Sequence, residues 1–202
     1  MPRPRIHDPE TVLDAAERLA AESGPAAVTV RAVAAATGVS NGAFYHTYAS
    51  RQEVLARTWV RAARRFLALQ AAAVDRAVTA ADAATRLDAV VDAAETPARL
   101  ADTHPDSARL LLLVDRDELL TGPLPPELAE QITATERALR TVLIRLARAL
   151  WGRADRRRVA TVTTCLVDLP TALLLRRDQL TDPLARKHLR AAVRAVLDVG
   201  PR

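Results

Sequence analysis

The chain has 202 residues, half of them apolar and 3% aromatic, and a formal net charge of +5, so it is long enough for one ordinary domain or for a small domain followed by a larger one. The single cysteine, Cys165, excludes an intramolecular disulfide, and the lack of a CxxC pair argues against zinc. Residues 1–8 contain no signal-peptide core and the apolar run 110–114 is far too short to span a bilayer, so we expect a soluble, cytoplasmic protein with no membrane partner.

Alanine and leucine, two strong helix formers, are abundant, and only six residues are glycine, so we expect an all-α protein. Nearly all positive charge is arginine, because Lys187 is the only lysine. Arginine binds phosphate through two parallel hydrogen bonds, but arginine and alanine also share GC-rich codons, and we take codon usage as the main reason for the overall arginine excess. The positions of the arginines are therefore more informative than their number.

Three helices are predicted in the first 47 residues. The first begins after Asp8, which is followed by a proline, and ends at Ser23 before a Gly-Pro pair. Two short helices follow, at about 29–37 and 40–47, and each opens on a threonine or serine that can cap it. Gly38 joins the two in a tight turn, because glycine accepts the left-handed backbone that such a turn requires.

The fourth predicted helix begins at Ser50, which forms a capping box with Glu53, and runs to about Asp75. Several further helical segments follow the fourth helix. The first three of them form two helices if Pro97 only kinks the helix, and three helices if Pro97 interrupts it. A loop is expected at 121–126. The later helical segments are predicted near 82–95, 97–104, 105–120, 126–151, 154–177 and 183–199.

Two short helices joined through glycine are what a reader of the DNA major groove needs. In such a motif the first helix packs behind the second, and the second offers side chains to base edges. The motif needs a small core of its own to fix the angle between the helices. The residues predicted to form this core are Val30, Val33, Val39, Phe44 and Tyr48.

The second short helix then presents a polar surface. Asn41 can bond adenine, Ala43 can touch a thymine methyl group, and His46 can reach either a base or a phosphate. Arginine is in excess here, because residues 24–65 hold six arginines and one acid; for Arg57, Arg61, Arg64 and Arg65 a solvated helix face is the alternative. The predicted DNA-binding residues are Thr29, Arg31, Ser40, Asn41, Gly42, Ala43, Tyr45, His46 and Arg51.

The run from Val28 to Leu55 resembles the TetR family of bacterial regulators. The match consists of a short helix, Gly-Val-Ser, an aromatic pair and Ser-Arg before the next helix. Three departures are mild: Tyr48 and Arg51 replace the usual Phe and Lys, and Ala43 replaces a common Thr, which favours a different base preference. The specific resemblance covers about a quarter of the chain.

This resemblance implies an all-helical homodimer of nine or ten helices that binds double-stranded DNA at an inverted repeat. By the same resemblance, residues 1–52 form a three-helix DNA-binding domain with the helix-turn-helix at about 29–48. Residues 53–202 form an effector-binding and dimerisation domain. The last two helices of each subunit form the dimer interface, and an unknown small-molecule effector releases the DNA. Repression is the default role of the family.

The residues of the C-terminal part give the dimer prediction moderate support. An apolar seam spaced 3-4-3-4 suits a helix bundle, although core within one subunit requires the same pattern. Pro170 should kink this helix and free a carbonyl near Leu166. Thr164 and Asp168 are proposed ligand contacts, with a polar surface as the alternative. The seam comprises Val159, Val162, Leu166, Leu169 and Leu173, continued by Leu189, Val193 and Val196.

Two other classes of function are the alternatives. An enzyme is disfavoured because the four histidines are scattered and no HExxH, Gly-rich phosphate loop or GxSxG motif occurs. The other is a helical ligand-binding or scaffold protein that does not bind DNA. We predict no catalytic residue, no metal ligand and no cofactor.

Overall fold

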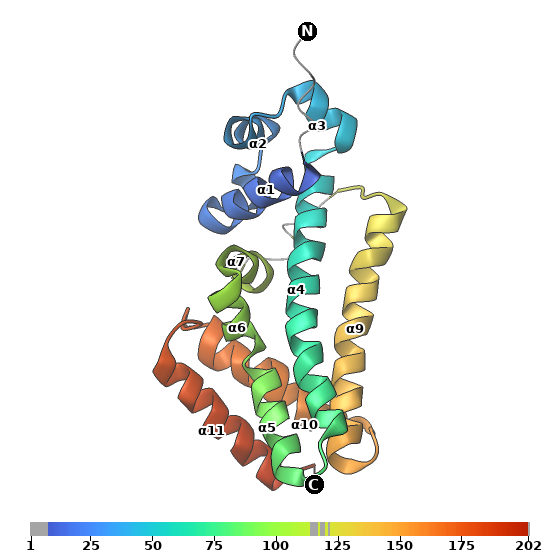
Figure 1. The fold of residues 1–202 in the computed structure, drawn as a ribbon, viewed down its shortest axis with the longest axis vertical. Coiled ribbons are helices and arrows are strands. Elements are labelled where there is room, and N and C mark those ends of the chain that lie inside the picture. Colours follow the sequence, from blue (N-terminus) through green and yellow to red (C-terminus); the bar gives the residue numbers. More distant parts are fainter. Residues whose placement is uncertain (1–7, 114–116, 118–119, 121, 202) are drawn as a thin grey trace. The chain divides into compact units, whose positions relative to one another are not determined.

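The computed structural model describes residues 8–113, 117, 120 and 122–201. In these residues all regular structure is helical, and ten α-helices are present, which confirms the expected all-α class (Figure 1). They group into two compact units. The first unit consists of residues 1–63 and 106–133, and the second of residues 64–105 and 134–202. The functional division predicted at residues 52 and 53 stays a prediction.

The first unit contains the three N-terminal helices and the start of a long fourth one. It also contains most of α7 and the first turns of α9. A short 3₁₀ turn, Pro25–Ala27, lies between α1 and α2. The bounds are α1 Pro9–Ser23, α2 Val30–Thr37, α3 Asn41–Thr47, α4 Arg51–Thr79, α7 Pro105–Leu113 and α9 Pro126–Trp151.

The predicted helix caps are present. The side chains of Asp8, Thr29 and Ser40 each accept a hydrogen bond from a backbone N–H in the first turn of α1, α2 and α3. At the other end of α2, Gly38 adopts a left-handed conformation with φ of 74°. The Ser50 hydroxyl accepts from the N–H of Glu53 at 3.1 Å, which is one half of the predicted capping box. The Glu53 carboxylate accepts from the N–H of Ala49 at 2.8 Å, one residue before the expected donor.

The core of the first unit is close to the predicted one. Val33, Val39, Phe44 and Tyr48 are all buried, and Val30 packs partly buried against them. Side chains from α1, α4, α7 and α9 complete the same cluster. The helix-turn-helix therefore rests on a continuous apolar core, which fixes the orientation of α3 relative to α2.

The second unit takes the rest of α4 and α9 together with the C-terminal helices. The helical structure is interrupted at Glu95, so α5, α6 and α7 are three separate helices. Pro97 lies in the first turn of α6. The predicted fourth helix ends at about Asp75, but α4 continues to Thr79, because the sequence after Asp75 contains no glycine or proline to end it. The bounds of the remaining helices are α5 Ala83–Ala94, α6 Thr96–Thr103, α10 Arg156–Thr163 and α11 Pro183–Val199.

The helix that begins with α10 changes its winding around Pro170. Two π-helical turns, Thr164–Asp168 and Thr171–Leu175, flank this proline. The N–H of Leu169 donates to the carbonyl of Thr164, five residues back. Because proline has no N–H, the ordinary bond to the carbonyl of Leu166 cannot form, and a wider turn is a known way to accommodate such a gap.

Half of the predicted apolar seam is core of this unit. Val162 and Val193 are 0% exposed and Leu166 is 5% exposed within a single chain. Leu189 is also fully buried, on the face of α11 that packs against α5. The four buried residues therefore serve the alternative role of intrasubunit packing, whereas Val159, Leu169, Leu173 and Val196 are half-buried. The predicted dimer interface stays a prediction.

Candidate nucleic-acid interface

The second helix of the motif, α3, carries an exposed polar surface. Asn41, Gly42, Tyr45 and His46 are all exposed, and the side chain of Tyr45 is 58% exposed. Ala43 is half-buried, because its methyl group packs partly against the core of the first unit. The arrangement presents hydrogen-bonding groups outward from a rigid helix, as direct contact with base edges requires.

The two capping hydroxyls flank this surface. Thr29 and Ser40 are exposed, and their oxygens accept from the N–H groups of Ala32 at 3.0 Å and Ala43 at 3.2 Å. Each hydroxyl still has its own proton to donate to a phosphate oxygen. Arg31 is exposed in the first turn of α2. These three residues suit backbone contacts, which position a reader without specifying sequence.

Arg51 has an additional role that the sequence did not indicate. Its Nε donates to the carbonyl of Val28 at 2.5 Å, and its Nη2 donates to the carbonyl of Pro25. The guanidinium thus ties the start of α4 to the segment that precedes α2. Nη1 remains the nitrogen of the fork that can face a phosphate. No sequence pattern signals this contact, because the partners are backbone carbonyls more than 20 residues away.

Other arginines of the first unit are paired internally. Arg57 contacts Glu53 at 2.7 Å. Arg61 binds Glu10 at 2.9 Å and Asp14 at 2.8 Å, and it also pairs with Glu17. The alternative of a solvated helix face is therefore wrong for Arg61, whose side chain is only 14% exposed. The arginine excess of residues 24–65 is partly neutralised by acids of α1.

Glu17, Arg61 and Ser107 form a buried polar cluster that sequence analysis missed. The Ser107 hydroxyl donates to one carboxylate oxygen of Glu17, and Arg61 binds the other. Burial acts to lower the pKa of Arg61, but the carboxylates of Glu17, Glu10 and Asp14 outweigh it and raise that pKa. The cluster joins α1, α4 and α7, and so fixes the position of α1 behind the helix-turn-helix.

The proposed ligand contacts lie at the surface of the second unit. Thr164 donates to the carboxylate of Asp168 at 3.1 Å, and Asp168 is exposed. Burial raises the pKa of the nearby Cys165 thiol to about 12. Thr164 lines an open groove of about 460 Å³ between α10 and the end of α11, together with Ala160, Thr161, Ala195, Val196, Val199 and Gly200.

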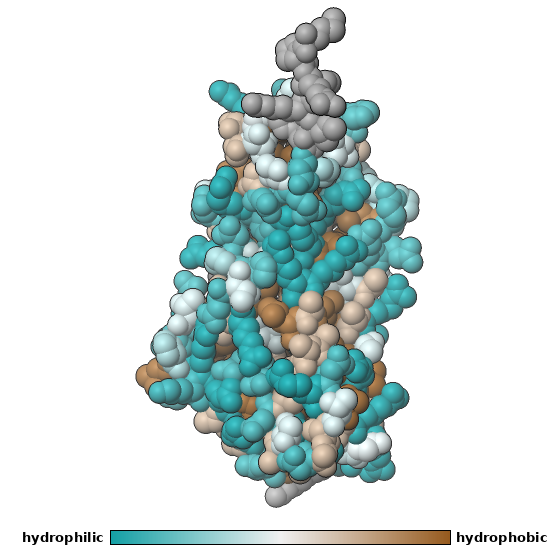
Figure 2. Space-filling model, in the orientation of Figure 1, coloured by the Kyte–Doolittle hydropathy of each residue, from teal (hydrophilic) through white to brown (hydrophobic). Residues whose placement is uncertain are grey.

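One helical stretch of the described residues, Arg156–Leu175, passes a test for membrane spans by length and apolar composition, and 28% of it is buried. A helix of a soluble protein passes the same test. The face drawn in Figure 2 is mostly hydrophilic, with apolar side chains in separate patches. Within the part of the chain that the structure describes, no group of three or more His, Cys, Asp or Glu side chains could hold a metal ion.

The N-terminal region matches a known protein family. Residues 12–58 fit the family model described as bacterial regulatory proteins, tetR family. This range contains α2, the Gly38 turn and α3, together with most of α1 and the start of α4. No curated protein matches the chain as a whole.

Solved structures share the fold. A candidate transcriptional regulator from Pseudomonas aeruginosa PAO1 is 19% identical, with a TM-score of 0.71 over 95% of this chain and 88% of that one. A TetR-family transcriptional regulator from Streptomyces coelicolor is 19% identical, with a TM-score of 0.60 over 95% and 98%. A candidate regulator from Saccharomonospora viridis, solved in complex with choline, is 20% identical, with a TM-score of 0.65 over 94% and 95%.

Identities this low establish the likeness of fold, while the matched N-terminal model adds a likeness of sequence in the helix-turn-helix. Both agree with the exposed α3 surface on its apolar core. The chain is thus a DNA-binding transcriptional regulator that resembles the tetR family of bacterial regulatory proteins in residues 12–58 and in its helical fold.

Proposed function

We propose that the protein is a ligand-responsive repressor that binds an inverted-repeat operator as a homodimer. The observation that carries this proposal is the exposed polar surface of α3, held by the Gly38 turn over a buried core. A two-fold dimer places two such helices in successive major grooves, so the operator has dyad symmetry.

The DNA contacts divide into two kinds. Asn41 hydrogen-bonds a base edge, His46 reaches a base, and the part of Ala43 left exposed touches a thymine methyl group. Gly42 lets the backbone of α3 approach the DNA closely, because it has no side chain. The phosphate contacts come from Thr29, Arg31, Ser40, Tyr45 and Arg51.

Dimerisation through α10 and α11 explains an otherwise unusual surface. Beyond its three leading arginines the stretch Arg156–Leu175 is mostly apolar, yet only 28% of it is buried in one chain. Ala160 and Val167 are exposed along it, and Val199 is 60% exposed on α11. A second copy covering these side chains removes apolar surface from water, which favours association. The interface therefore uses the exposed faces of α10 and α11.

The effector response rests on the size of the second unit. A groove reader and a dimer interface together need only part of the chain, and the other helices of the second unit can enclose a ligand site. The likeness to the choline-bound protein of Saccharomonospora viridis is compatible with a small-molecule ligand, although its identity does not transfer at 20% sequence identity. Thr164 and Asp168 remain the proposed polar contacts.

The test is a gel shift with DNA from upstream of the protein's own gene. Wild-type protein should retard this DNA and lose it to unlabelled specific competitor. Asn41→Ala should lose discrimination at one base pair in each half-site, by about 1–3 kcal/mol. His46→Ala and His188→Ala form a matched pair, because both histidines are exposed, on α3 and on α11. An equal effect of the two histidine variants would contradict the assignment of α3 as the reader.

A further inference from the structure

Positive charge is most concentrated outside the helix-turn-helix. Residues 137–158 contain eight arginines and a single acid, Asp155, in a chain whose total net charge is only +5. This segment covers the last turns of α9, the loop that follows, and the first turn of α10. It lies entirely within the second unit.

Most of these arginines are free of acidic partners. Arg145 pairs with Asp75 and Arg158 pairs with Asp155. Arg153 is 71% exposed and lies 3.6 Å from Asp155, which it shares with Arg158. Within the described residues, none of the other five has a carboxylate within ion-pair distance. We define the arginine surface as the six exposed arginines Arg137, Arg140, Arg148, Arg153, Arg156 and Arg157.

In the same unit, the arginines of α11 are neutralised. On α11, Arg186 pairs with Asp102 at 2.7 Å, Arg194 pairs with Asp88 at 2.5 Å, and Arg190 pairs with Glu95. These arginines bind α11 to α5 and α6. Within the described residues, five of the six arginines of the arginine surface make no such link between helices.

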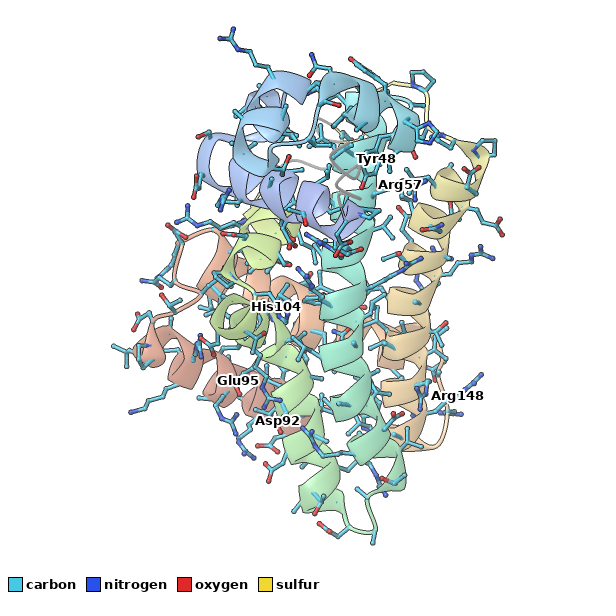
Figure 3. All side chains as sticks on the ribbon, turned by 45° about the horizontal axis from the view of Figure 1, so that its top comes forward. Tyr48, Arg57, Asp92, Glu95, His104 and Arg148 are labelled. Carbon is cyan, nitrogen blue, oxygen red and sulfur yellow. The ribbon has the colours of Figure 1, made fainter. Side chains whose placement is uncertain are left out.

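The arginines of α9 in this surface lie along one side of the helix. Arg137 and Arg148 are three helical turns apart and therefore share one face of α9, about 16 Å from end to end. Arg148 lies on the outer side of α9 near its end (Figure 3). The first turn of α10 adds Arg156 and Arg157, where the helix dipole is itself positive and opposes their charge. An anionic polymer relieves this repulsion.

We propose that the arginine surface is a second binding surface for the phosphate backbone of duplex DNA. Arginine binds phosphate oxygens through two parallel hydrogen bonds. Residues 137–158 contain no Asn, Gln or His, so the surface holds the backbone without the side chains that most often read adenine. The protein binds DNA through α3, and a second surface adds affinity for any duplex sequence. The proposal goes beyond operator reading and needs no effector.

The experiment compares matched pairs of exposed arginines of the second unit in the full chain. One double variant is Arg156→Gln with Arg157→Gln, and the control is Arg176→Gln with Arg177→Gln. Each removes two positive charges. A third variant, Arg148→Gln with Arg153→Gln, leaves α10 unaltered, and sedimentation checks that all variants keep the wild-type oligomeric state.

Binding of a fluorescent duplex without operator sequence is measured by anisotropy between about 50 and 200 mM salt. The plot of log K against log salt has a negative slope, and the magnitude of this slope should decrease by about 2 units per subunit for either surface variant, at about 0.9 per phosphate contact. The 176/177 control should keep the wild-type slope. Asn41→Ala should also keep it, so failure of operator reading is distinguishable from failure of this surface.

Two results would overturn the proposal. One is an equal change in slope for the surface variants and the 176/177 control, because charge alone would then explain it. The other is an unchanged slope in every variant, even where the surface variants lose binding to vesicles of phosphatidylserine and phosphatidylcholine. That last pattern would assign the arginine surface to an anionic lipid membrane.

Discussion

The phenol hydroxyl of Tyr48 donates a 2.9 Å hydrogen bond to the backbone carbonyl of Pro9. The two residues are 39 positions apart, and the bond ties the end of α3 to the first turn of α1 (Figure 3 labels Tyr48). Tyr48 is 3% exposed, and burial raises its pKa. Tyr48 therefore both packs in the core and makes a hydrogen bond that phenylalanine at the same position could not make.

Replacing Tyr48 by phenylalanine should lower the free energy of unfolding by about 1 kcal/mol, because the ring still packs but the hydrogen bond is lost. Tyr45→Phe is the control, since Tyr45 is exposed and should contribute nothing measurable. Urea unfolding followed by circular dichroism measures both. Equal stability of the Tyr48 variant and the wild type would show that the bond to Pro9 contributes nothing.

Two substitutions of Arg51 should separate its role in stability from its role in DNA binding. Lysine keeps the charge but cannot reach two carbonyls with a planar fork. Arg51→Lys should therefore lower the stability of the first unit and keep the salt dependence of operator binding. Arg51→Gln should lower both, with the salt slope falling by about 0.9 per subunit. An Arg51→Lys protein as stable as wild type would refute the role of the bonds to Val28 and Pro25.

Substitutions at exposed positions of α10 should disrupt the dimer. Ala160→Glu places a charge on the exposed face of α10 that we assign to the interface, and it should give folded monomers in sedimentation. Ala72→Glu on α4 is the control at an exposed alanine. Leu166→Glu and Val193→Glu should instead unfold the chain, because both residues are core. A dimeric Ala160→Glu protein with normal affinity would exclude this face.

Acid should weaken the attachment of α11 through Asp102. Its hydrogen bond from Arg186 holds the pKa of Asp102 below its usual range. A lowered pKa contributes stability that is present above the unfolded pKa and is lost as the pH falls through the folded pKa. Asp102→Asn should therefore cost less than about 1 kcal/mol at pH 7, since the pair is partly exposed.

The difference between Asp102→Asn and wild type should then shrink below about pH 4. Asp198→Asn is the control, because Asp198 is an exposed acid of α11, the helix that carries Arg186. The measurement is the urea midpoint of each protein across this range. A difference that stays constant down to about pH 2 would show that the charge of Asp102 is not responsible.

Sequence patterns sufficed where the determinants are local. The caps at Thr29 and Ser40, the turn at Gly38 and the core valines depend on neighbours within a few residues, and each was predictable. Contacts between distant residues were not. The cluster of Glu17 and Ser107 joins positions 90 residues apart, and nothing in either local sequence encodes the pairing.

The apolar seam of α10 illustrates a different limit. A 3-4-3-4 repeat states that one face of a helix is buried, but not which surface buries it. Burial within one chain resolved this for Val162 and Leu166. The charge pattern was similarly incomplete, because the acids that neutralise Arg61 lie on α1. Arg31 of the predicted set remains exposed, whereas Arg51 is engaged in part by carbonyls.

The most direct test of the proposed function is a hydroxyl-radical footprint of the protein on DNA from upstream of its own gene. A dimer with two α3 readers should protect two half-sites related by a dyad, with their centres about one helical turn or a multiple of it apart. His46→Ala should weaken both half-sites equally, and His188→Ala should leave them unchanged. A single asymmetric protected region, or no protection at any upstream sequence, would contradict operator binding as a two-fold dimer.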